Sequence, residues 1–257
     1  MGKKKMDKYF STLQKANKKL FVPYIVAGDG GLDCLIERIH MLDKAGVAAI
    51  EIGIPFSDPV ADGPTIQEAG IRALKLNITL NKVLDTLASN SIPIKAPIII
   101  MTYINPIFVL GIEYFADKCK RVGVDGVLIP DLPMEEEELV KDTFQMYNIA
   151  IIRLIALTST KERIEQIAKN AEGFLYLVSV AGTTGARVFH QNRVYDYLKQ
   201  LKSISSVPVL AGFGVSTSNQ AQRLNYYCDG VVVGSKIVDL FHQGKEKEIQ
   251  QLIHESI

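Results

Sequence analysis

The stretch Ala48–Ala69, AAIEIGIPFSDPVADGPTIQEA, carries the most informative pattern in the chain. Its first residues alternate isoleucine with small residues and one glutamate, so the isoleucines share one face of a strand and Glu51 points to the other face. A carboxylate inside such a run is costly unless it is paired or used in chemistry. Pro55 ends the strand, and an acidic loop containing Asp62 leads into a helical pattern. The stretch predicts a catalytic carboxylate at the carboxyl end of a strand, beneath an acidic loop.

The same alternation of strand and helix extends along the chain. The expected strands are Leu20–Ala27, Ala48–Ile54, Ile98–Tyr103, Gly126–Ile129, Ile149–Leu154, Phe174–Val178, Val207–Ala211 and Gly230–Val233. The expected helices are Met6–Ala16, Leu32–Ala45, helical segments from Thr65 to about Ser89, Gly111–Val122, Met134–Tyr147, Thr160–Asn170, Arg193–Ser203, Ser216–Asn225, Lys236–His242 and one from Glu246 onward. Ser159 with Glu162 predicts a capping box, and the acidic run 135–138 is interpreted as a solvated first turn.

Eight strand–helix units predict a single (β/α)8 barrel domain over residues 1–257, with an extra N-terminal helix. The near-continuous apolar strands are typical of a parallel sheet covered by helices. A doubly wound open sheet is the alternative, although no G-x-G-x-x-G turn follows the first strand. In a barrel the site lies in the loops at the carboxyl ends of the strands. Two of these loops are long, Pro55–Pro64 and Val180–Asn192.

Composition narrows the class of protein. The 29 basic and 28 acidic residues give a formal net charge of +1, which does not suggest binding to nucleic acid or to an anionic membrane. No apolar run approaches the roughly 20 residues that cross a bilayer, so we expect a cytoplasmic protein. The three cysteines are far apart and are expected to be reduced thiols: Cys34, Cys119 and Cys228. The four histidines show no metal-ligand spacing, so no protein-bound metal is expected: His40, His190, His242 and His254.

Glycine-bearing turns follow the last three expected strands. They are Gly182–Gly185, Gly212–Gly214 and Gly234–Ser235. Glycine lets backbone N–H groups approach a ligand, and Ser235 stands where a helix begins and its dipole is positive. Any one of these turns alone would be an ordinary turn. Three in succession predict a phosphate cradle, because the last loops of a barrel usually form one.

The two carboxylates differ in how strongly they suggest catalysis. Asp62 alone fits an ordinary turn, since Asp-Gly-Pro is a common turn sequence. Glu51 fits either an interior salt bridge or a general acid–base whose pKa is raised by burial, and its strand offers no obvious cation. Gly53 is expected to leave room above Glu51 for a substrate. No lysine ends a strand, since Lys236 falls in a helix, so Schiff-base chemistry is not expected.

Beside the cradle, several large side chains could form an apolar slot for a flat ring. They are Phe21, Met101, Leu128, Tyr176 and Phe213. For Tyr103 and Tyr176, packing in the core is an equal alternative. A slot of this kind next to a phosphate cradle indicates an aromatic phosphate ester as the ligand.

Six segments resemble the tryptophan synthase alpha subunit family, and the match covers nearly the whole chain. They are FVPYIVAGD at 21–29, EIGIPFSDPVADGPTIQ at 51–67, MTYINPIF at 101–108, PDLP at 130–133, AGTTG at 181–185 and GFGVS at 212–216. The resemblance implies cleavage of indole-3-glycerol phosphate to indole and D-glyceraldehyde 3-phosphate by a retro-aldol route, without a cofactor in this chain. Glu51 matches the acid–base that protonates indole C3, and Asp62 matches the carboxylate that holds the indole N–H.

The resemblance also implies substrate and partner contacts. The implied substrate contacts are Phe21, Met101, Tyr103, Leu128, Tyr176, Thr184, Gly185, Phe213, Gly214, Gly234 and Ser235. Met101 stands where a leucine is common, and Val180 stands where some members carry an arginine, which bears on loop closure. The implied partner is a beta subunit that carries pyridoxal phosphate, in an α2β2 tetramer. Its expected contacts, several of them exposed apolar residues, are Pro55, Phe56, Asp58, Asn105, Pro106, Phe108, Asp131 and Pro133.

Two other functions are open from the sequence. One is a ligand-sensing subunit whose main task is to regulate a partner. The other is a different phosphate-handling barrel, such as a sugar-phosphate isomerase, which indole among the products would exclude.

Overall fold

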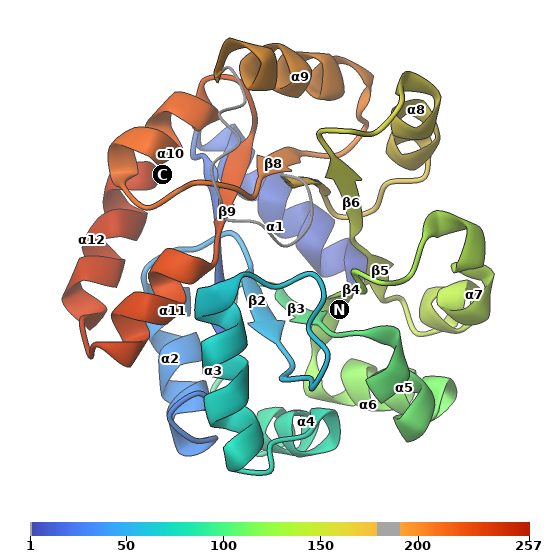
Figure 1. Ribbon diagram of the computed structural model, residues 1–257, viewed down its shortest axis with the longest axis vertical. Coiled ribbons are helices and arrows are strands. Elements are labelled where there is room, and N and C mark those ends of the chain that lie inside the picture. The colour runs from blue at the N-terminus through green and yellow to red at the C-terminus, as the bar shows by residue number, and fades with distance from the viewer. Residues whose placement is uncertain (1, 179–190) are drawn as a thin grey trace.

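The computed structural model describes residues 2–178 and 191–257, whose strands form one parallel sheet curled into a nearly closed barrel (Figure 1). The strands are β1 Leu20–Val26, β2 Ile50–Gly53, β3 Ile98–Met101, β4 Val124–Leu128, β5 Ala150–Ile151, β6 Arg153–Ala156, β7 Leu175–Val178, β8 Val209–Ala211 and β9 Gly230–Val233. Their order is β5-β4-β3-β2-β1-β9-β8-β7-β6. The barrel prediction is confirmed, and the open doubly wound sheet is excluded.

The expected fifth strand is divided. Ile152 separates β5, which pairs with β4, from β6, which pairs with β7. The Ile152 N–H still donates to the Val127 carbonyl at 2.9 Å, so this residue stays on the β4 side. The prediction of one continuous strand at 149–154 was wrong because its two halves bond to different neighbours. The barrel closes across this break.

Helices surround the barrel as an outer ring (Figure 1). The ring consists of α2 Asp33–Lys44, α3 Pro64–Lys75, α4 Leu80–Ala88, α5 Ile104–Leu110, α6 Ile112–Val122, α7 Glu138–Met146, α8 Lys161–Lys169, α9 Gln191–Ile204, α10 Ser218–Asn225, α11 Ser235–His242 and α12 Glu246–Ser256, with a 3-10 turn η1 at Met134–Glu136, whereas α1 Lys3–Lys15 lies inside the ring in this view. Their amphipathic sequences bury one face each against the outer side of the strands.

The leading helix α1 closes one end of the barrel. Its buried Met6 and Phe10 belong to one core cluster with inward-facing strand residues, namely Leu20, Val22, Ile99, Leu128, Ile152, Phe174, Leu210 and Val232. Asp125 fixes the start of the helix, since its carboxylate accepts from the Gly2 N–H at 2.8 Å and pairs with Lys5 at 3.0 Å. This apolar floor leaves the opposite end, at the carboxyl ends of the strands, for the site.

Several helix starts differ from the expectation. The cap of α8 is Thr160, whose hydroxyl accepts from the Arg163 N–H at 3.3 Å, so the prediction that Ser159 is the cap was wrong by one residue. Thr217 forms the capping box at the start of α10. Helix α5 was missed, because a seven-residue helix with a proline in its first turn leaves a weak pattern.

Candidate functional site

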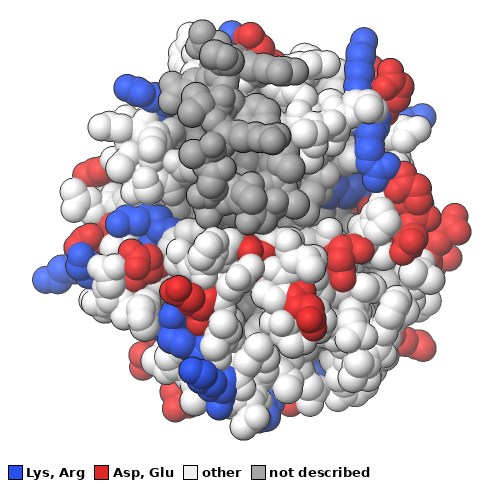
Figure 2. All heavy atoms as spheres, viewed as in Figure 1, with Lys and Arg blue, Asp and Glu red and all other residues white. Residues whose placement is uncertain are grey.

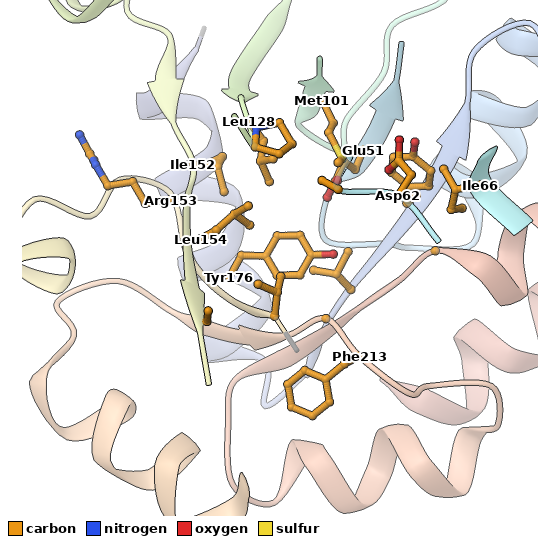
Figure 3. Close-up of a pocket in the computed structure, with 18 of the residues that line it drawn as sticks. Glu51, Asp62, Ile66, Met101, Leu128, Ile152, Arg153, Leu154, Tyr176 and Phe213 are labelled. Carbon is orange, nitrogen blue, oxygen red and sulfur yellow. The ribbon is translucent and has the colours of Figure 1, made fainter. Parts of the chain in front are cut away.

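A cavity of about 870 Å³ opens at the carboxyl ends of the strands. Strand ends and the loops after them supply its lining, which includes Tyr24, Glu51, Asp62, Ile66, Met101, Leu128, Ile152, Leu154, Tyr176, Gly212, Phe213, Gly214, Gly234 and Ser235. In Figure 3, Glu51 and Asp62 lie close together on one side and the Tyr176 ring extends toward Glu51. The structure thus brings the two predicted carboxylates to one pocket.

Glu51 lies on β2 and is completely buried. Neither of its carboxyl oxygens has a hydrogen-bond partner among the described residues. Burial, with a smaller contribution from the charge of Asp62, raises the pKa of Glu51 from 4.5 to about 8. Within the described chain the interior salt bridge is therefore excluded, and the side chain presents a protonated carboxyl to the cavity at neutral pH.

Asp62 occupies the loop between β2 and α3 and is held by Tyr103. The Tyr103 hydroxyl donates to Asp62 Oδ2 at 3.2 Å and accepts from the Ala61 N–H at 3.0 Å. Burial raises the pKa of Asp62 from 3.8 to about 6, and the hydrogen bond from Tyr103 opposes that rise. Most Asp62 side chains therefore carry a negative charge at pH 7. Tyr103 supports Asp62 and is not part of the cavity lining.

The apolar slot contains four of the five residues expected there, namely Met101, Leu128, Tyr176 and Phe213. Phe21 is the exception. On β1, Leu20 and Val22 face the barrel interior, so Phe21 points outward and is buried in the core beneath the helices. Tyr24 takes the place in the pocket. Counting the alternation from Leu20 along β1 would have identified it.

Gly53 serves a different purpose from the one expected. A β-carbon at this position would lie 1.9 Å from the Tyr24 hydroxyl oxygen. The space beside Gly53 is therefore filled by Tyr24, and the prediction that it is kept for substrate was wrong. Gly212 has the same relation to Tyr176, since a β-carbon there would lie 1.6 Å from Tyr176 Cε2. Each glycine makes room for a tyrosine of the pocket.

The glycine turns after β8 and β9 lie side by side at the cavity wall. Gly214 has a φ of 67°, which suits glycine. Gly234 caps α11, and Ser235 is its first residue, so N–H groups at the positive end of a helix dipole face the pocket. This arrangement can hold an anion. The third turn, 182–185, lies outside the described residues, and with it Thr184, Gly185 and Val180.

The outer part of the cavity contains an ion pair that the sequence did not suggest. Arg153 on β6 donates through Nε to Glu137 Oε1 at 2.8 Å, through Nη2 to Glu137 Oε2 and through Nη1 to the Asn170 carbonyl. Both ionic side chains are buried and both line the cavity. The interpretation of the acidic run 135–138 as wholly solvated was therefore wrong for Glu137. An arginine within an apolar strand was the available signal.

The residues expected to contact a partner divide by exposure. Pro55 is buried, and Phe56 is half-buried with its ring stacked on Tyr103 at 5.0 Å between centroids, so these two are not free surface residues. The exposed members are Asp58, Asn105, Phe108, Asp131 and Pro133, and Pro106 is half-buried. Phe108 is 45% exposed, and its neighbour Val109 is 81% exposed. Figure 2 shows few charged side chains over α5.

Across residues 2–178 and 191–257, no three His, Cys, Asp or Glu side chains gather closely enough to hold a metal ion. The same stretches contain no helix with the length and apolar character needed to cross a membrane. The three cysteines are free thiols, and Cys119 and Cys228 are buried.

Comparisons with known proteins agree on one family. A family model described as tryptophan synthase alpha chain matches residues 10–257. The chain is 56% identical over 257 residues to the tryptophan synthase alpha chain of Oceanobacillus iheyensis, covering 100% of this chain and 98% of that relative. It is 46% identical over 254 residues to the one from Bacillus cereus strain ATCC 14579, covering 99% and 97%.

Solved structures give the same result. The tryptophan synthase subunit alpha from Legionella pneumophila str. Paris superposes with a TM-score of 0.88 at 32% identity, covering 100% of this chain and 97% of that one. A protein from Aquifex aeolicus VF5 superposes with a TM-score of 0.90 at 35% identity, covering 98% and 97%. The similarity extends over the whole barrel, including the elements that surround the pocket.

Proposed function

This chain belongs to the tryptophan synthase alpha chain family, and from that premise we propose that its pocket cleaves indole-3-glycerol phosphate with Glu51 and Asp62 as the catalytic carboxylates. The protein is a lyase of tryptophan biosynthesis. The observation that carries the proposal is the protonated, unpartnered carboxyl of Glu51 at the cavity wall.

Glu51 acts as both acid and base. Its carboxyl delivers a proton to indole C3, which turns the ring into a cation with the positive charge on its nitrogen. The Glu51 carboxylate then removes the proton of the hydroxyl on the carbon bonded to C3. The electron pair of the bond between C3 and that carbon returns to the ring. Indole and glyceraldehyde 3-phosphate are released, and Glu51 regains its proton.

Asp62 stabilises the cation that forms between these two steps. Its charged carboxylate is positioned by Tyr103 and accepts a hydrogen bond from the indole N–H. This hydrogen bond becomes stronger as positive charge develops on the nitrogen. Asp62 is partly buried, which strengthens this interaction relative to one in bulk water. Because the positive charge on the indole nitrogen exists only during the reaction, losing Asp62 should lower mainly the turnover rate.

The rest of the pocket orients the substrate. The apolar side chains of Met101, Leu128 and Phe213 receive the indole ring, and the turns at 212–214 and 234–235 hold the phosphate through backbone N–H groups. Thr184 and Gly185, which lie outside the described residues, are assigned to the same phosphate contacts because the resemblance to the family implies them. We also propose that residues 1–257 form one catalytic barrel domain in the cytoplasm, without a cofactor or metal of its own.

The partner is a tryptophan synthase beta subunit, in an α2β2 assembly in which pyridoxal phosphate belongs to the beta subunit. The exposed apolar residues Phe108 and Val109 on α5, with Pro133 and Asp131 in the neighbouring loop, support a contact face beside the mouth of the pocket. The Ile104 N–H donates to Asp131 at 3.0 Å, so this loop and α5 are held together as one surface.

The decisive experiment is incubation of the purified chain with indole-3-glycerol phosphate, with and without a beta subunit. Indole release that requires Glu51 supports the proposal. Release of an isomerised sugar phosphate without indole would favour another phosphate-handling barrel. Absence of indole under both conditions, together with normal binding to the beta subunit, would favour a purely regulatory subunit.

A further inference from the structure

Tyr24 lies on the barrel wall between the two parts of the site. Its strand β1 pairs with β2 on one side and with β9 on the other. Tyr24 is directly opposite Glu51 across the first pairing. Across the second, Pro23 is opposite Val233, so Tyr24 is level with Gly234 of the phosphate cradle. The tyrosine therefore stands between the acid–base carboxyl and the expected phosphate position.

The side chain spans this interval. A β-carbon at Gly234 would lie 3.6 Å from Tyr24 Cδ1, which places that edge of the ring beside the cradle. At the other end, the hydroxyl oxygen would lie 1.9 Å from a β-carbon at Gly53, two residues beyond Glu51 on the same strand. The ring thus runs from the cradle toward the carboxylates, along the cavity that it lines.

The hydroxyl is a polar group without an assigned task. Tyr24 is only 7% exposed, and its hydroxyl makes no hydrogen bond to any of the residues that the structure describes. Burial, followed by the charges of Asp62 and Glu51, raises its pKa well above the usual value of 10. It therefore keeps its proton at neutral pH. Tyr24 lines the cavity, so a ligand bound there can accept a hydrogen bond from this unpartnered hydroxyl.

We propose that the Tyr24 hydroxyl donates a hydrogen bond to the middle hydroxyl of the substrate's three-carbon chain. The inference rests on the proposed function. With the phosphate at Gly234 and the reacting carbon at Glu51, the carbon between them passes alongside Tyr24. That carbon carries the chain's remaining free hydroxyl, since the reacting carbon carries the one deprotonated by Glu51. Tyr24 is thus a specificity-determining residue that selects a hydroxylated chain over a deoxy chain.

The test pairs a residue change with a substrate change. Tyr24→Phe removes only the hydroxyl, and the matched substrates are indole-3-glycerol phosphate and its analogue lacking the middle hydroxyl. For the natural substrate, Tyr24→Phe should lower kcat/KM about twofold to tenfold, the usual range for one neutral hydrogen bond. For the deoxy analogue the variant and parent should be equal. Tyr103→Phe is the control, because its hydroxyl serves Asp62 and its loss should slow both substrates by the same factor.

Each outcome decides the question. Selective loss on the natural substrate supports the assignment, as the two changes are then coupled. Equal loss on both substrates would overturn it and place the hydroxyl's effect on Glu51 or Asp62. Equal activity of variant and parent on the natural substrate would also overturn it. Circular dichroism establishes that the variant folds. Failure of the parent itself to release indole would refute the proposed function instead.

Discussion

Replacing Glu51 with glutamine should stabilise this protein in a way that depends on pH. Glutamine keeps the size and reach of the side chain but cannot ionise. The carboxyl that it replaces is completely buried and has no hydrogen-bond partner in residues 2–178 or 191–257. In the unfolded chain the glutamate ionises with a pKa near 4.5, whereas in the folded protein burial and the Asp62 charge raise the pKa to about 8.

The direction of this pH dependence follows from the difference in proton binding between the folded and unfolded protein. Between these two pKa values the folded protein holds a proton on Glu51 that the unfolded chain has lost, so raising the pH favours unfolding. The contribution of the Glu51 proton to the parent's stability is fully present below pH 4.5, falls as pH rises toward 8 and is lost above it. At ~1.4 kcal/mol per pH unit, the parent should lose about 3 kcal/mol between pH 5 and pH 7 relative to Glu51→Gln. Contributions from Asp62 are common to both proteins and largely cancel.

Urea unfolding of the two proteins at pH 5, 6 and 7 measures this difference. Glu37→Gln, on the exposed side of α2, is the matched control and should follow the parent at every pH. The same Glu51→Gln preparation should turn over indole-3-glycerol phosphate about a hundredfold to ten-thousandfold more slowly, the usual scale for an acid–base group. Two parallel stability curves would refute the assignment of a protonated buried carboxyl. Turnover within about threefold of the parent would remove Glu51 from the mechanism.

Three further changes test other parts of the site. The pH profile of kcat/KM should be bell-shaped, with an acidic limb near pH 6 where Asp62 ionises and a basic limb near pH 8 where Glu51 loses its proton. Tyr103→Phe should move the acidic limb to higher pH, because the hydrogen bond that lowers the pKa of Asp62 is lost. If Tyr103→Phe leaves the acidic limb where it is, the ionisation of Asp62 is not the cause of that limb. Ser235→Asp should raise the substrate Kd at least tenfold in calorimetry, since it sets a like charge against the phosphate; unchanged binding would mean that the cradle is misplaced. Phe108→Ser should weaken binding to a beta subunit by about tenfold or more, because the loss of apolar burial at such a contact costs about 1–2 kcal/mol. Indole release by the isolated chain should be unchanged. Unaltered complex formation by gel filtration would count against the α5 face.

Local pattern was enough for the features that depend on one strand or one turn. The alternation around Glu51 gave its inward direction, and the spacing of strands and helices gave the barrel. The exposure of Phe56 could not be read in this way, because it depends on a stack with Tyr103 from another loop. The partner test accordingly uses Phe108, since changing Phe56 would disturb the support of Asp62 as well.

Features that join distant segments could not be predicted from the sequence either, because they too depend on contacts that form only in the folded chain. Arg153 and Glu137 each look unusual in their own segments, yet only the folded chain shows that they form one buried pair. Gly53 could be recognised as a position that needs space, but not as the position that Tyr24 fills. Choosing Phe21 over Tyr24 was a different kind of error, because the alternation along β1 already distinguished them.

The two carboxylates share one pocket but receive different roles from their surroundings. Glu51 on β2 accepts no hydrogen bond from the described residues, so removal from water dominates and it remains an acid. Asp62 on the loop retains a hydrogen bond from Tyr103, so it ionises first. Since the charge on Asp62 is itself a cause of the raised pKa of Glu51, the loop carries part of the acid's tuning. Displacing the loop would remove the group that stabilises the indole nitrogen, and it would also remove the smaller of the two causes that raise the pKa of Glu51, so the position of this loop affects both carboxylates.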